Sequence, residues 1–128
     1  MAKTPIPSEV RRFILTSLPS VPHLEALLLL RATAPTAWTA TELAQRLYVP
    51  AGRARDVMAY LSDAGMCSAD EYASAYAYAP QSRELGGIID AVALFYSSNL
   101  VDITLLIHSK SDPRAQQFAD AFRFRKDA

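Results

Sequence analysis

Two arginines and a tyrosine on one predicted helix are the residues in this sequence best suited to bind a ligand. On a helical wheel of residues 51–64, Arg53, Arg55 and Tyr60 flank an outward face. Guanidinium groups bind phosphate oxygens and can pair with the edge of guanine, and a tyrosine can contact a sugar. An ordinary solvated helix face accounts for the two arginines equally well.

Side chains that could catalyse a reaction are few and lie apart in the sequence. His23 and His108 fall on different predicted helices, and neither has a second metal ligand three or four positions away. The single cysteine, Cys67, follows Met66 in a predicted strand, where we expect it to be buried and unreactive. Gly86-Gly87 lacks the surrounding pattern of a phosphate-binding loop. We therefore predict that the protein is not an enzyme and binds no metal or cofactor.

Local signals set the boundaries of the helix that carries the arginines and of the helix before it. Thr39 and Glu42 have the spacing of a capping box, in which hydroxyl and carboxylate each satisfy a free backbone amide. Pro50 separates the two helices because it disfavours helical geometry at the residue before it. Gly65 suits the position after the second helix, where the backbone turns left-handed. The sequence predicts helices over 39–47 and 51–64.

A pair of short strands is predicted to follow. Residues 66–68 and 75–79 have the composition of strands, the polar residues 69–72 would form the turn, and Pro80 would close the hairpin. The helix before the hairpin has an apolar stripe that we expect to be buried, formed by Ala54, Val57, Met58 and Leu61.

In this order of elements, residues 39–80 resemble the winged helix-turn-helix transcriptional regulators of bacteria. The resemblance covers about a third of the chain and implies a mostly α-helical fold with a small β-hairpin wing. It also implies a dimeric DNA-binding regulator that places helix 51–64 in the major groove. The residues that would then contact DNA are Thr41, Arg46, Gly52, Arg53, Arg55, Asp56 and Tyr60.

The charges of the same segment favour an alternative function. Residues 39–80 hold three basic residues (Arg46, Arg53, Arg55) and five acidic ones (Glu42, Asp56, Asp63, Asp70, Glu71). Non-specific DNA affinity depends largely on neutralising phosphates, and Asp56 would repel them unless it accepts a proton from cytosine. The alternative is a winged-helix module that binds another protein and not DNA. Its surface would be the hairpin or the tyrosines Tyr60, Tyr72, Tyr76 and Tyr78.

Residues 8–38 are predicted to form two helices that support this unit. The first runs from Ser8 to about Leu18, and the second from Ser20 to about Ala32. Leucines cover more than one face of the second helix, which indicates a central place in the core. Trp38 is expected to pack over the start of the helix-turn-helix, because large aromatic residues are more often core residues than ligand platforms.

Residues 82–108 have a helical pattern of some 27 residues, or roughly 40 Å. Alternating spacings of four and three connect Leu85, Ile89, Val92, Tyr96, Asn99, Ile103 and Leu106. Such a heptad seam is typical of helices that pair with one another, and a single polar residue, here Asn99, commonly fixes their register. We therefore predict one long helix that forms a homodimer interface. The alternative is a long core helix in a monomer.

The last predicted element is a short amphipathic helix that begins at Asp112. Phe118 and Phe122 lie on its apolar face, and basic residues gather at its end. It could cross to a partner subunit, so the two phenylalanines complete the predicted dimer interface, or fold back on its own domain.

Composition is typical of a single domain over residues 1–128, divided into 8–38, 39–80 and 81–128. About half of the residues (51%) are hydrophobic, and 13 acidic residues balance 13 basic ones, which excludes a disordered or strongly polybasic chain. One cysteine and no recognisable signal peptide predict a cytoplasmic protein. Residues 88–107 are long enough to span a membrane but contain Asp90, Asn99 and Asp102, so we interpret them as part of a soluble fold.

Overall fold

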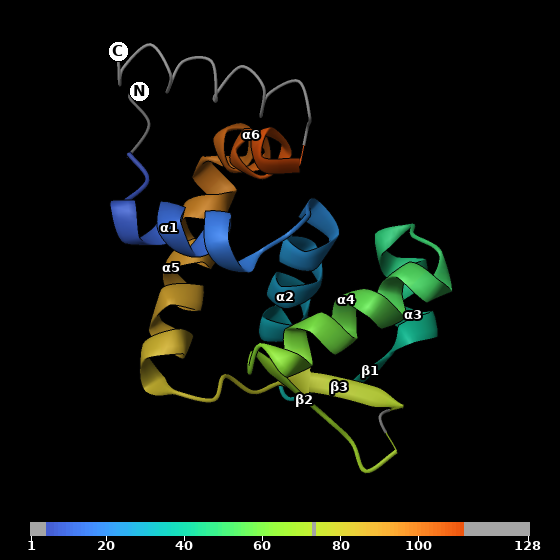
Figure 1. Cartoon of the computed structure of the whole chain (residues 1–128). Coiled ribbons are helices and arrows are strands. Elements are labelled where there is room, and N and C mark those ends of the chain that lie inside the picture. Colours follow the sequence, from blue (N-terminus) through green and yellow to red (C-terminus); the bar gives the residue numbers. More distant parts are fainter. Residues whose placement is uncertain (1–4, 73, 112–128) are drawn as a thin grey trace, which may run out of the picture.

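A computed structural model describes residues 5–72 and 74–111 of the chain (Figure 1). Its elements are α1 (Ser8–Ser17), α2 (Val21–Ala32), β1 (Trp38–Thr39), α3 (Ala40–Leu47), α4 (Ala51–Asp63), β2 (Cys67–Ala69), β3 (Ala75–Tyr78), α5 (Arg83–Ser98) and α6 (Leu100–Ser111). The predicted mostly helical fold with a small antiparallel sheet is confirmed. The helix predicted from Asp112, with Phe118 and Phe122, lies outside the described residues.

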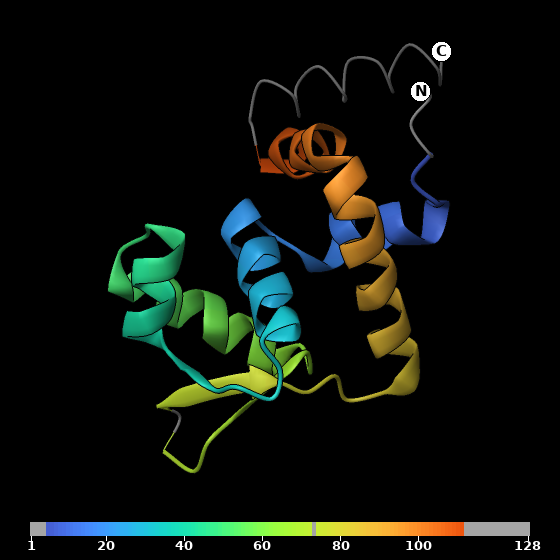
Figure 2. The same cartoon turned by 180° about the vertical axis from the view of Figure 1, so that it is seen from behind.

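Helix α2 lies at the centre of the molecule, as its sequence predicted. It contacts α3, α4, β3 and α6, and Leu24, Leu27 and Leu30 are fully buried. In both views the pair α3–α4 and the sheet lie on one side of α2, and α1, α5 and α6 lie on the other (Figures 1 and 2). The run of leucines therefore serves two packing surfaces at once, which a helix with a single apolar stripe could not do.

The sheet contains one strand that the sequence analysis did not predict. Its order is β1-β3-β2, all antiparallel, with Trp38 opposite Tyr76 and Cys67 opposite Tyr78. The indole Nε1 of Trp38 donates to Thr33 Oγ1 at 2.9 Å, which holds β1 near the end of α2. The predicted β2–β3 hairpin is thus joined by a third strand that comes from the segment before α3.

The capping signals at Thr39, Glu42 and Gly65 act as predicted, whereas neither Ser8 nor Ser20 caps a helix with its side chain. Thr39 Oγ1 accepts from the Glu42 amide at 3.1 Å, and Glu42 Oε1 accepts from the Thr39 amide at 2.9 Å, which completes the capping box of α3. Ser82 Oγ accepts from the Leu85 amide at 3.0 Å at the start of α5. Gly65 has φ +77°, the left-handed conformation predicted for the residue that follows α4. These features are local, so short sequence patterns were enough to predict them.

Two glycines give a matched test of backbone conformation. Gly65→Ala is expected to lower the free energy of unfolding by about 1–2 kcal/mol, because alanine is strained at positive φ. Gly52→Ala is expected to raise it by roughly 0.5 kcal/mol, since a Cβ there meets nothing within 4 Å and alanine favours the helix. Urea denaturation of both variants measures this difference. Equal effects of the two changes would contradict the assigned conformations.

The predicted continuous helix over 82–108 is wrong. The chain bends by 113° between α5 and α6, and the break lies at Asn99, whose φ and ψ are −129° and 35°. The Asn99 amide donates to Phe95 O and its carbonyl accepts from the Ile103 amide, both at 2.9 Å, so this residue ends one helix and begins the next. Asparagine is favoured at such positions, and Ser97-Ser98 before it are weak helix formers.

The bend has a packing reason. Both α5 and α6 contact α1, which a straight helix of this length could not do along its whole course. The predicted seam is therefore used within the chain: Ile89, Val92 and Ile103 are fully buried in its own core, and Asn99 is 2% exposed. Leu85, Tyr96 and Leu106 are half-buried against the same core. As a continuous strip for pairing with a second copy, the seam predicted from residue 85 to residue 106 does not exist.

Among the described residues, no single helix has both the length and the apolar character needed to cross a membrane. Two consecutive pairs, α1 with α2 and α5 with α6, reach those values only when each pair is taken together across its bend of 112° or 113°.

Candidate nucleic-acid interface

Helices α3 and α4 pack against each other across a tight turn. The turn begins at Tyr48, which ends α3 with φ +59°, and Val49 N donates back to Ala44 O at 3.1 Å. Pro50 then precedes the first residue of α4. Leu43 and Ala44 from α3 and Val57 and Met58 from α4 are buried, so the pair is held rigidly. In consequence, the opposite face of α4 has a fixed orientation.

That outward face of α4 carries most of the residues predicted to contact a nucleic acid. Gly52, Arg53, Arg55 and Asp56 are exposed, whereas the stripe Ala54, Val57, Met58 and Leu61 is buried as predicted. On α3, Thr41 and Arg46 are also exposed. In the part of the chain that the structure describes, none of the three arginines Arg46, Arg53 and Arg55 has a salt-bridge partner. Their guanidinium groups are therefore available to an external anion.

Two of the acidic residues in this unit have structural partners. Glu42 belongs to the capping box, where hydrogen bonds from Thr39 hold the pKa of its carboxyl below the ordinary value. Asp70 closes the β2–β3 hairpin: it accepts from Ser74 Oγ at 2.5 Å and from the amides of Ser74 at 2.7 Å and Ala75 at 3.3 Å. These bonds, chiefly the one from the Ser74 side chain, lower the pKa of Asp70. Folding alone thus explains both carboxylates.

Tyr60 does not lie beside the outward face where the helical wheel placed it. Its hydroxyl donates to Ser17 O at 2.9 Å, and its ring meets that of His23 edge-on at a centroid distance of 4.9 Å. His23 Nδ1 in turn lies 2.6 Å from Ser20 Oγ. Tyr60 therefore joins α4 to the junction of α1 and α2, and its hydroxyl is already bonded within the protein.

The other tyrosines divide into two groups. Tyr76 and Tyr78 on β3 are half-buried against the core, and burial raises the pKa of Tyr78. Tyr48 and Tyr72 are instead 95% and 81% exposed, the first in the α3–α4 turn and the second in the β2–β3 link. The sequence analysis did not single out Tyr48, although its place before Val49-Pro50 in a turn is a signal for exposure.

The histidines and the cysteine considered for catalysis lie on separate elements of the described chain: His23 on α2, Cys67 on β2 and His108 on α6. Cys67 is buried, which raises the pKa of its thiol to about 11 and disfavours the nucleophilic thiolate. Among these residues, no three His, Cys, Asp or Glu side chains gather as a metal site would require. His108 is exposed on α6, distant in sequence from the His23–Tyr60 contact.

Comparison with known proteins adds no relative. No protein-family model, curated protein or solved structure matches this chain. The function must therefore be argued from the geometry and chemistry of the chain itself.

Proposed function

We propose that residues 21–80 form a winged helix-turn-helix that binds duplex DNA, and that the protein acts as a dimeric transcriptional regulator. In this proposal α4 is the recognition helix and the β2–β3 hairpin is the wing. The observation that carries the proposal is the face of α4 described above: a helix fixed on its inner side by α2 and α3, with Arg53 and Arg55 exposed and unpaired.

The order of elements supports the proposal. A helix, a short strand, two helices joined by a tight turn and a hairpin succeed one another from α2 to β3, and β1 pairs with the second strand of the hairpin. In Figure 1 the β2–β3 hairpin extends from the sheet below α4. A helix of the length of α4, 13 residues, fits the major groove, and Gly52 at its start lets a phosphate approach the backbone closely.

Structural roles explain two of the five acidic residues in the segment 39–80. Glu42 and Asp70 are negatively charged, but Glu42 caps α3 and Asp70 closes the hairpin turn. Their presence is therefore not evidence for a basic protein partner. The other charged residues of α3 and α4 are exposed: Arg46, Arg53, Arg55, Asp56 and Asp63. We therefore expect weak non-specific binding, with affinity that depends on contacts to a specific sequence.

A homodimer remains part of the proposal, with an interface different from the seam predicted by the heptad pattern. Leu94 on α5 and Leu100, Val101 and Leu105 on α6 are the large aliphatic side chains that stay 49–69% exposed among the described residues. They carry no charge, so a symmetric copy of the same surface would meet them without burying an unpaired ion. Two recognition helices about one DNA turn apart, roughly 34 Å, would then bind two half-sites.

The exposed aromatic side chains favour a second candidate function. Tyr48 and Tyr72 contribute little to the fold, and Glu71 lies next to Tyr72 in the link between the strands. Tyrosine is enriched at protein interfaces because its ring is apolar while its hydroxyl can form hydrogen bonds with water or a partner. A winged-helix module that binds a protein through the hairpin would use these residues and would not need the arginines of α4.

Titration of mixed-sequence duplex DNA with the purified protein at low and then physiological salt distinguishes the two candidates. A DNA-binding protein that neutralises phosphates is expected to bind at low salt and to weaken steeply as salt rises, with a slope of about −0.9 per phosphate contact in a double-logarithmic plot. The mass of the complex, measured by light scattering, gives the number of subunits bound. Absence of binding even at low salt would reject the DNA proposal and favour the protein-binding one.

A further inference from the structure

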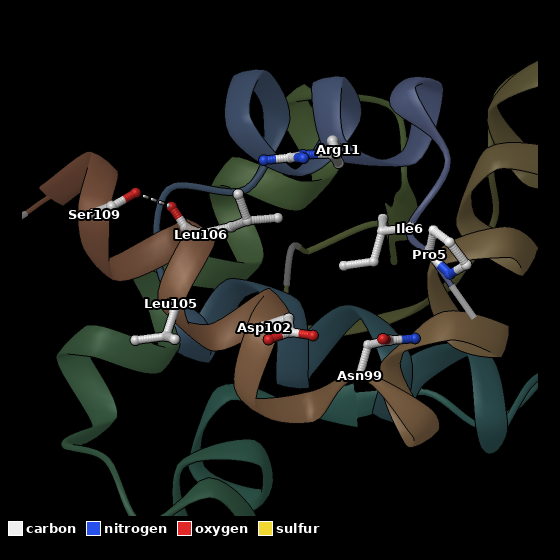
Figure 3. A pocket seen from close by; sticks show the side chains of 8 residues that line it. All are labelled: Pro5, Ile6, Arg11, Asn99, Asp102, Leu105, Leu106 and Ser109. Carbon is white, nitrogen blue, oxygen red and sulfur yellow. Dashed lines mark hydrogen bonds between the residues drawn. The ribbon is translucent and has the colours of Figure 1, made fainter. Parts of the chain in front are cut away.

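A pocket of about 550 Å³ opens between the start of the described chain, α1 and α6 (Figure 3). Its polar groups do not converge on a ligand, because Arg11 points away from Asn99 and Asp102 lies beside Asn99. No buried side-chain nitrogen or oxygen among the described residues lacks a hydrogen-bond partner. We therefore assign no ligand to this pocket. The turn between α3 and α4 carries a stronger signal.

Tyr48 holds an unusual backbone conformation in that turn. Its φ and ψ are 59° and 45°, and among the described residues it is the non-glycine residue with a positive φ. Bulky residues rarely adopt this left-handed conformation, and glycine or asparagine would hold it at a lower cost. The turn itself therefore does not explain why a tyrosine occupies this position.

The side chain of Tyr48 makes no contact that would offset this cost. It is 95% exposed, the largest value for a big hydrophobic side chain in the described part of the chain, and its hydroxyl has no hydrogen-bond partner there. The backbone is nevertheless held firmly, since the amides of Tyr48 and Val49 both donate to Ala44 O. An exposed residue that is held rigidly in a strained conformation is typical of a binding surface.

The charge around Tyr48 is positive. Residues 43–55 contain Arg46, Arg53 and Arg55 and no aspartate or glutamate. All three arginines are exposed, and none has a salt-bridge partner within the described residues. A free hydroxyl in such surroundings fits an anionic partner, because its proton can be donated to an oxygen that the arginines attract.

The position of Tyr48 relative to α4 indicates which anion it would meet, and this step rests on the proposed function. Three positions separate Tyr48 from Ala51, the first residue of α4, a stretch that spans at most about 11 Å. With α4 in a major groove about 12 Å wide, the turn lies at the edge of the groove, where the phosphates are. We propose that the Tyr48 hydroxyl donates a hydrogen bond to a phosphate oxygen of the DNA backbone. Such contacts fix the orientation of a protein on the duplex.

Tyr48→Phe removes the hydroxyl alone and is the main test. Its Kd for mixed-sequence duplex DNA at low salt is expected to rise about fivefold, because one hydrogen bond to a charged group is lost. The slope of log K against log salt should stay unchanged, since a neutral hydroxyl displaces no counterion. Arg53→Ala should instead make that slope shallower by about one. Fluorescence anisotropy with the full chain across a salt series measures both quantities.

Two further variants separate binding from folding. Tyr96→Phe removes the same hydroxyl from α5, outside the proposed DNA-binding surface, and is expected to leave the Kd unchanged. Tyr48→Asn removes both ring and hydroxyl but suits the left-handed turn, so its Kd should rise about tenfold while its Tm rises by about 2–4 °C. Weaker binding by a more stable protein would exclude damage to the turn as the cause.

The possible failures distinguish this inference from the proposed function. If the parent protein binds DNA and Tyr48→Phe binds equally well, the hydroxyl contacts no phosphate, even where Tyr48→Asn binds weakly. An equal loss in Tyr96→Phe, or a shallower slope in Tyr48→Phe, would also overturn the inference while DNA binding stands. If the parent protein does not bind DNA even at low salt, both proposals are wrong, and the exposed Tyr48 favours the protein-binding candidate.

Discussion

Replacing Arg53 and Arg55 together by alanine is expected to lower the affinity for mixed-sequence duplex DNA at low salt by roughly tenfold, because two side chains that neutralise phosphates are lost. The salt dependence should also become shallower by about two in slope if both side chains neutralise phosphates. Fluorescence anisotropy with labelled mixed-sequence DNA across a salt series measures both quantities. The fold should be unaffected, since both side chains are exposed and unpaired.

The control for that prediction is a variant with the same loss of charge at other exposed positions. Arg12→Ala with Arg83→Ala removes two positive charges from α1 and α5, neither of which belongs to the proposed DNA-binding surface. We expect this variant to lose only a small part of the affinity through the weaker overall field. Equal losses in the two double variants would show that net charge, and not the face of α4, determines binding.

Leu27→Ala is expected to reduce the free energy of unfolding by about 2–5 kcal/mol, the largest effect on stability that we predict. Leu27 is fully buried in α2, the helix that contacts both halves of the molecule. Its removal leaves a cavity that neither half can fill without moving relative to the other. Because total stabilities are about 5–15 kcal/mol, the loss is a large fraction, and the Tm should fall by roughly 10 °C or more.

The same chemical change on the surface provides the comparison. Leu94 is 69% exposed on α5, and Leu94→Ala should alter the free energy of unfolding by no more than about 0.5 kcal/mol. Thermal unfolding of both variants at low protein concentration measures the difference. If Leu27→Ala were as mild as Leu94→Ala, the central position assigned to α2 would be wrong.

Elements fixed by neighbouring residues were predictable from the sequence, and those fixed by distant ones were not. The capping box of Thr39 and Glu42 and the left-handed Gly65 depend on atoms within a few residues. Strand β1 has only two residues, and it is a strand because it pairs with β3, where Trp38 lies opposite Tyr76. A two-residue segment has no periodicity to detect.

The bend at Asn99 shows how a correct pattern can support a wrong element. Ile89 and Val92 on α5 and Ile103 on α6 are all buried in the core of the chain itself, whereas their apolar spacing was interpreted as a seam between two subunits. The alternative, a core face, fits their burial. The pattern does not reveal whether that face is straight, because two helices that surround a third bury the same positions. The position predicted for Tyr60 was wrong for a related reason. Its hydroxyl donates to Ser17 O on α1, and a helical wheel of α4 contains no residue of another helix.

The exposed face of α4 could be predicted from the sequence. The parts of the molecule that lie around it could not. Arg53 and Arg55 are exposed as expected because the buried stripe on the opposite face is unambiguous. The pocket between α1 and α6 has no counterpart in the sequence analysis, since its lining residues come from opposite ends of the described chain. No local pattern encodes such a meeting of distant segments.

The packing of α1 against α5 and α6 also fixes an order of events during synthesis. Helix α1 finds its main partners in α5 and α6, whereas α2, α3, α4 and the sheet contact one another within residues 21–78. Chains emerge from the ribosome with the N-terminus first, and distant contacts form more slowly than local ones. Val10 and Ile14 therefore cannot reach their final environment until α5 and α6 have been made, although α1 precedes both of them in the chain.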